Sequence, residues 1–203
     1  MSSLRLTVFS TPVLSAVLVI APPFPASCLP TARAEILTFT ASLSGLNEAP
    51  PTPSSGSGFS TLTIDTLANT MRVEANFENL LAGVTACHIH GATAVPFMGN
   101  AGVMTPTPTF PGFPSGVTMG TYDMTFDMTM ASSYNPAFVT ANGGSVAASF
   151  AALISAVEGG RAYLNIHSTQ FPGGEIRGFY VPGPGAAAVL ALGGLVAARR
   201  RRS

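Results

Sequence analysis

The chain has 203 residues, with nine basic and nine acidic side chains and therefore a formal net charge of zero. The charges are unevenly placed, because only three arginines but all nine carboxylates lie between residues 35 and 181. This middle part carries a net charge of about −6 and no lysine, which disfavours a nucleic-acid-binding function.

Residues 1–34 have the pattern of a secretory signal peptide. Arg5 precedes a short apolar run, Val13–Ile20, and the segment ends in the A-x-A site Ala32-Arg33-Ala34. We expect cleavage after Ala34. The mature domain would then hold a single cysteine, Cys87, so a disulfide framework is not expected.

Residues 35–180 are predicted to form one domain that is mainly β. Residues 35–43 form a β-rich opening segment, and period-two alternation of apolar and polar residues predicts strands at 59–65, 71–78, 84–90, 122–130 and 162–168. The Ala-rich segment 145–158, followed by two glycines, predicts one short helix. Together they favour an antiparallel β-sandwich of Greek-key type with one short helix, plus hydrophobic helices at the N- and C-terminal ends of the chain.

Residues 181–203 form a three-part tail. A Pro/Gly hinge at 181–185 precedes thirteen small and apolar residues at 186–198, and four arginines follow. The apolar part is short for a membrane-spanning helix, and the arginines would stay on the cytoplasmic side. We therefore expect a short membrane helix that makes transient membrane contact during export.

Two of the three histidines, His88 and His90, lie one residue apart on a predicted strand. Side chains alternate along a strand, so both project from the same face, about 7 Å apart by the strand rise. The third, His167, shares a polar strand face with Tyr163 and Asn165.

If the two strands are neighbours, the three histidines are expected to hold copper or zinc in a three-His site. Glu175 is the candidate fourth ligand or supporting partner. The alternative is a hydrogen-bonded polar layer at a sheet end, and the sequence does not choose between the two.

The segment Gly173-Gly174-Glu175-Ile176-Arg177 begins with a tight turn that needs glycine. Glu175 and Arg177 share a strand face, so they can bind each other, neighbouring groups or a ligand. A structural ion pair or hydrogen-bond network that fixes the turn is the favoured interpretation.

Three segments in this order resemble the CHRD domain, named for its occurrence in chordin. They are residues 41–51, with the sequence ASLSGLNEAPP, residues 87–91, CHIHG, and residues 163–178, which include YLNIHS and GGEIRG. The resemblance spans about residues 37–180 and implies an extracellular β-sandwich-like module, a family without an agreed biochemical activity. The H-x-H strand and late Gly-rich turn are also similar to Cu/Zn superoxide dismutase, which is an analogy of fold.

The tail resembles a PEP-CTERM sorting signal. Gly183 stands where that motif has glutamate; the matching positions are Val181, Pro182, Pro184, Arg199, Arg200, Arg201 and Arg202. The resemblance implies removal by an exosortase-type processing enzyme and delivery to the cell surface or extracellular matrix of a Gram-negative bacterium.

The sequence thus favours an exported surface or exopolysaccharide-matrix protein whose domain is a non-catalytic interaction module for polysaccharide or a surface protein. No catalytic residues are assigned, because the sequence has no nucleophile elbow, zinc-protease helix or phosphate-binding loop. The alternative is a copper- or zinc-binding metalloprotein, a superoxide-dismutase-like oxidoreductase. A protease inhibitor or growth-factor binder follows only by analogy with chordin.

Overall fold

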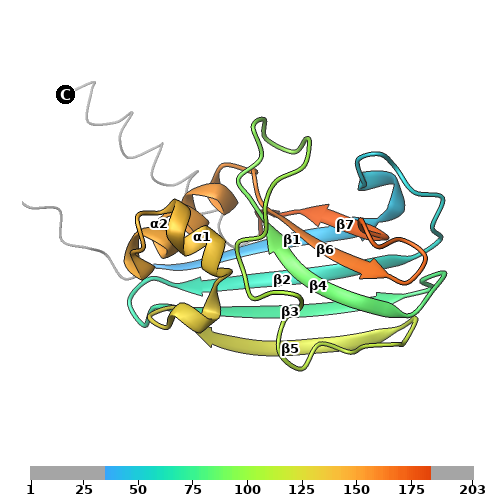
Figure 1. The fold of residues 1–203 in the computed structure, drawn as a ribbon, viewed down its shortest axis with the longest axis horizontal. Helices are drawn as coiled ribbons and strands as arrows, with labels where there is room; N and C mark the ends of the chain where they lie inside the picture. Colours follow the sequence, from blue (N-terminus) through green and yellow to red (C-terminus); the bar gives the residue numbers. More distant parts are fainter. Residues whose placement is uncertain (1–34, 184–203) are drawn as a thin grey trace, which may run out of the picture. The chain divides into compact units, whose positions relative to one another are not determined.

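The computed structural model describes residues 35–183, which form one antiparallel sheet with helices packed at one end of it (Figure 1). The strands are β1 (Ile36–Ser44), β2 (Ser57–Asp65), β3 (Thr70–Glu78), β4 (Val84–His90), β5 (Gly120–Asp127), β6 (Tyr163–Ser168), β7 (Ile176–Phe179) and β8 (Val181–Pro182). Their order across the sheet is β4-β6-β7-β1-β2-β3-β5, and β8 pairs with β1. The helices are α1 (Pro136–Ala141) and α2 (Val146–Glu158), with 3-10 turns η1 (Gly45–Asn47) and η2 (Ala131–Ser133).

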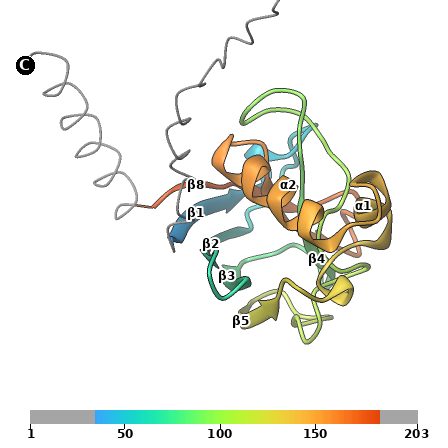
Figure 2. The same ribbon diagram turned by 90° about the vertical axis from the view of Figure 1, so that its left-hand side faces the viewer.

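The predicted alternation builds the core. The inward face of β3 consists of Met71, Val73, Ala75 and Phe77, all buried. The same alternation buries Phe39, Ala41 and Leu43 on β1, Cys87 and Ile89 on β4, and Leu164 and Ile166 on β6. The sheet curls around this core, and α2 contributes Phe150, Leu153 and Val157 to it (Figure 2).

The predicted two-sheet Greek-key sandwich is replaced by a single curled sheet. β1 pairs with β2 along its whole length and with β7 and β8 on its other edge. The strands on the two sides of β1 therefore belong to one continuous sheet. No further strand of the sheet pairs with the outer edge of β4 within the described residues, and loop residues lie along that edge instead. In these loops Met104 N donates to the Ile89 carbonyl and Phe110 N to the Cys87 carbonyl, which protects that edge from pairing with another chain.

The predicted helix is confirmed as α2, whose N-cap Ser145 accepts a hydrogen bond from Ala148 N. A second helix, α1, was not predicted, although Asn135 and Pro136 are a typical N-cap and first-turn pair. The strand predicted at 122–130 ends earlier, at Asp127. The carboxylate of Asp127 accepts hydrogen bonds from the backbone and hydroxyl of Thr129 and so turns the chain away from the sheet.

The domain extends slightly further than predicted at its C-terminal side. Val181 and Pro182, placed in the sorting tail by the sequence, form β8, and Gly183 N donates to the Thr38 carbonyl. The expected terminal hydrophobic helices, the signal peptide and the remainder of the tail lie outside residues 35–183. Within those residues no helix has the length and apolar character needed to cross a membrane.

Candidate functional site

Strands β4 and β6 are direct neighbours, and their pairing brings the three histidines together. His88 lies opposite Asn165, and His167 lies opposite Ala86. The side chains of β4, β6 and β7 that point away from the core form what we call the polar face, and its members are His88, His90, Tyr163, Asn165, His167 and Arg177. The candidate nitrogen ligands of the three histidines all lie within 4.8 Å of one another.

Each imidazole directs its Nδ1 atom at a backbone carbonyl oxygen from a covering loop. The pairs are His88 with Pro108 (2.9 Å), His90 with Ala101 (2.8 Å) and His167 with Pro172 (3.0 Å). A carbonyl oxygen only accepts, so each Nδ1 carries the proton and each neutral ring has its lone pair on Nε2. The Nε2 atoms of His88 and His167 lie 3.0 Å apart.

Burial keeps these rings neutral. His88 is 7% exposed and His167 is 8% exposed. Burial, reinforced by the neighbouring rings, lowers the pKa of His88 to about 4, and burial lowers the pKa of His90 to about 4 as well. The pKa of His167 is also lowered by burial. Three neutral imidazoles are the protonation state that metal binding requires.

Glu175 does not join the histidine group. Its Oε1 accepts hydrogen bonds from Ser54 Oγ and Leu81 N, both at 2.6 Å, so the carboxylate ties two loops to the sheet. Glu175 and Arg177 therefore bind neighbouring groups and not each other. Gly174, at φ +130°, closes the predicted turn, and a Cβ there would lie 2.7 Å from Glu48 Oε1.

Arg177 is the centre of a second buried polar group. Its Nε donates to the Asn47 carbonyl and lies 3.7 Å from Glu48 Oε2, while Nη1 donates to Asn100 Oδ1 at 2.7 Å. Burial raises the pKa of Glu48 to about 7 against the lowering effect of Arg177. The partner Glu48 was missed at the sequence level, although it lies within the segment 41–51 that carries the family resemblance.

Tyr163 connects the two groups. Its ring stacks on His90, with centroids 4.9 Å apart and planes 5° apart. The guanidinium of Arg177 lies 4.6 Å from the centroid of the same ring. The histidine group and the Arg177 group are therefore parts of one continuous polar face.

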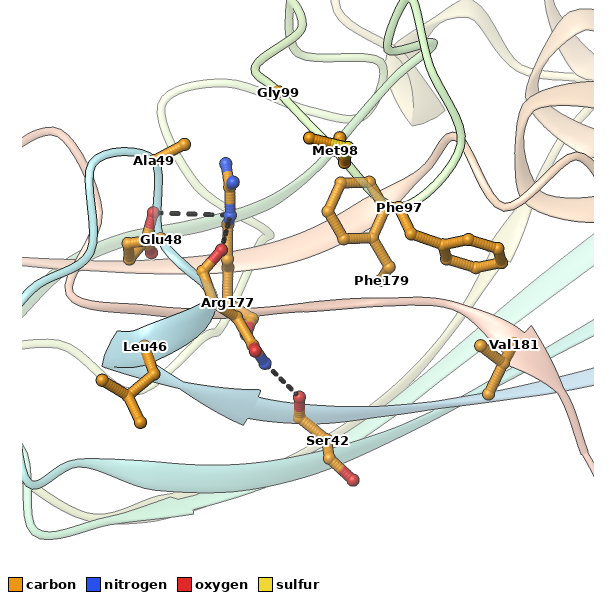
Figure 3. Close-up of a pocket in the computed structure, with 11 residues that line it drawn as sticks. Ser42, Leu46, Glu48, Ala49, Phe97, Met98, Gly99, Arg177, Phe179 and Val181 are labelled. Carbon is orange, nitrogen blue, oxygen red and sulfur yellow. Dashed lines mark hydrogen bonds and ion pairs between the residues drawn. The ribbon is translucent and has the colours of Figure 1, made fainter.

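The Arg177 group borders a surface hollow of about 570 Å³, which we call the Arg177 hollow. Figure 3 shows Glu48 and Arg177 on one side of it and Phe97, Met98 and Phe179 on the other. Leu46, Met98 and Phe97 are 80%, 65% and 53% exposed. The hollow thus combines a buried polar floor with an exposed apolar rim.

The sorting-signal residues from Pro184 onward and the cleavage-site residues Ala32 and Ala34 lie outside the part of the chain that the structure describes. Comparison with known families gives one match, in which the CHRD domain model covers residues 39–180. No curated protein and no solved structure matches the chain.

Proposed function

Since the chain belongs to the CHRD domain family, we propose that it is an exported bacterial surface or exopolysaccharide-matrix protein whose domain serves as a non-catalytic interaction module. Polysaccharide or another surface protein is the partner that we propose. The Arg177 hollow carries this proposal, because large apolar side chains gathered at the rim of a hollow are typical of interaction surfaces.

Export rests on the two terminal segments. Cleavage after Ala34 would leave β1 complete, since that strand begins at Ile36. The tail would then be removed by an exosortase-type enzyme near Val181–Pro184. Because Val181 and Pro182 pair with β1, this enzyme must either cut beyond Gly183 or peel β8 from the sheet.

Export is tested by expressing the full chain in a Gram-negative host that has an exosortase and fractionating the culture. We expect the protein in the surface or matrix fraction, without the arginine cluster. Protein that keeps both ends and stays in the cytoplasm would refute this part of the proposal.

The interaction surface is tested by binding to the exopolysaccharide and surface-protein fractions of the same host. Leu46→Ser and Met98→Ser should each weaken binding, because they remove exposed apolar area at the rim of the hollow. Leu67→Ser is the matched control, since Leu67 is 72% exposed but lies on the β2–β3 turn. Equal binding by all three variants would exclude the hollow as the contact surface.

The copper or zinc alternative has one specific observation in its favour, the convergence of His88, His90 and His167. That observation supports metal binding. Dismutase-like chemistry would additionally need a redox-active ion, and superoxide removal by the copper-loaded protein tests for it.

A further inference from the structure

We propose that one copper or zinc ion binds to the Nε2 atoms of His88, His90 and His167 and clamps the loops that cover the polar face. This goes beyond the interaction function and does not depend on what the Arg177 hollow binds. The proposal stands on the hydrogen-bond inventory of the three rings, on the spacing of their free nitrogens and on the origin of their backbone partners.

The hydrogen-bond inventory leaves the Nε2 atoms without suitable partners. With Nδ1 protonated against Pro108 and Pro172, the Nε2 atoms of His88 and His167 are both acceptors, yet they face each other at 3.0 Å. Two lone pairs in this arrangement need a shared proton or a cation between them. Nε2 of His90 is also buried and has no hydrogen-bond partner within the described residues.

The spacing fits a small metal ion. Donor atoms that bind zinc tetrahedrally at about 2.0–2.1 Å stand about 3.3 Å from one another. Here the Nε2 atoms of His88 and His167 stand 3.0 Å apart, and one ligand nitrogen from each of the three rings can be chosen so that all lie within 4.8 Å of one another. A movement of His90 that brings its Nε2 to the same ion would complete the set. Three protein ligands leave a fourth position for water or another small ligand.

The donor types select the class of ion. Imidazole nitrogens suit zinc and copper, whereas calcium and magnesium require oxygen ligands. The one carboxylate predicted nearby, Glu175, is engaged with Ser54 and Leu81. The thiol of Cys87 lies on the opposite, core-facing side of β4. A site of three neutral nitrogens therefore favours copper or zinc.

Because each ligand ring is hydrogen-bonded to a loop carbonyl, an ion that holds the rings also holds the loops in place. The carbonyls of Ala101 and Pro108 belong to the β4–β5 connection and that of Pro172 to the β6–β7 loop, and each orients one ligand ring from outside the ligand sphere. The loop containing Ala101 also supplies Phe97 and Met98 to the Arg177 hollow. An ion that fixes His90 thus fixes Ala101 and, through it, one wall of the hollow.

The site is tested with the full chain, expressed without a histidine tag. After loading with Zn²⁺ or Cu²⁺ and dialysis, elemental analysis should find about one ion per chain, and Co²⁺ should give the visible absorption of a tetrahedral site. Loss of an outer partner alone weakens metal sites roughly 10–100-fold, so His90→Gln and His167→Gln should weaken binding at least that much.

Cys87→Ala is the control that keeps all three ligands while removing the only thiol in residues 35–183. It should bind the ion as the wild type does. Folded wild-type protein without retained metal, or equal retention by His90→Gln and the wild type, would overturn the site. Circular dichroism checks that each variant is folded, and either histidine variant suffices for the comparison.

The clamp is tested by hydrogen exchange of the same wild-type protein with and without Zn²⁺ or Cu²⁺. Amides of residues 91–103, 105–116 and 169–175 should exchange more slowly with the ion, while those of α2 keep their rate. If one ion binds but exchange in these loops is not slowed, the proposal that the ion holds the loops is refuted, while the proposed metal site itself stands.

Discussion

The buried pair of Arg177 and Glu48 gives the sharpest test of how the polar face is held together. Arg177 is 2% exposed and donates to Asn47 and Asn100 while lying 3.7 Å from Glu48. Arg177→Met keeps an unbranched apolar stem but removes every donor. Breaking a buried pair from one side costs about 3–5 kcal/mol, because the remaining charge has no partner.

The size of this loss depends on pH through Glu48. Because burial raises the pKa of Glu48 to about 7, the carboxyl is largely protonated at pH 6 and largely charged at pH 8. Without Arg177 the neutral acid stays buried more easily than the anion. We therefore expect a loss of about 3–5 kcal/mol at pH 8 and a clearly smaller loss at pH 6.

The assay is urea unfolding followed by circular dichroism, since the chain has no tryptophan. Arg72→Met is the control, because Arg72 pairs with Asp123 on the exposed side of the sheet, where its side chain is 46% accessible, and should cost much less. Adding Glu48→Gln to Arg177→Met should remove the difference between pH 6 and pH 8. A loss below about 1 kcal/mol at pH 8, as for a surface pair, would refute the reasoning.

Three further predictions follow from the same part of the molecule and its boundary. The metal-free protein should lose stability as pH falls from 6.5 towards 4, because the unfolded chain binds protons that the folded one, in which the pKa values of His88 and His90 are about 4, does not. The total loss should be up to about 3 kcal/mol. Urea unfolding at pH 7 and pH 4.5 measures this loss, and an equal loss in His90→Gln would contradict the explanation. Gly174→Ala should cost about 2–3 kcal/mol in a thermal melt, because φ is +130° and the new Cβ would meet Glu48, whereas Gly173→Ala has open space and should change little. Amino-terminal sequencing of the exported protein should begin at Glu35, and any other start would move the cleavage site.

Local patterns in the sequence were sufficient for most of the elements. Alternation identified β2 and β3, including the inward residues Met71 and Phe77, and the Ala-rich pattern followed by two glycines identified α2. These elements follow from period and capping, which neighbouring residues determine. The short helix α1 was missed although its Asn135-Pro136 start signal is equally local.

The sheet arrangement and the partners of Arg177 could not be predicted in the same way. Nothing near Arg177 in the sequence indicates Glu48, because the two are brought together only by the pairing of Ser44 with Arg177 across β1 and β7. The choice between one curled sheet and two packed sheets likewise depends on which edges of β1 are used. From the sequence, the three histidines were expected to come together only if the strands that carry them are neighbours. The pairing of β4 with β6 fulfils this condition.

The unusual feature of this domain is that β6 is buried on both faces. A strand covered on both sides is ordinarily filled with Val, Ile and Leu, but this one carries Asn165 and His167 on its second face. Buried polar atoms without partners cost about 1–3 kcal/mol each. Four such atoms lack a hydrogen-bond partner within the described residues: Nε2 of His90, Oδ1 of Asn165, Oε1 of Glu48 and Oε2 of Glu175. A purely structural face would relieve this cost with apolar side chains. Since His90 and Asn165 belong to the polar face and Glu48 borders the Arg177 hollow, these two sites are where ligands should be sought first.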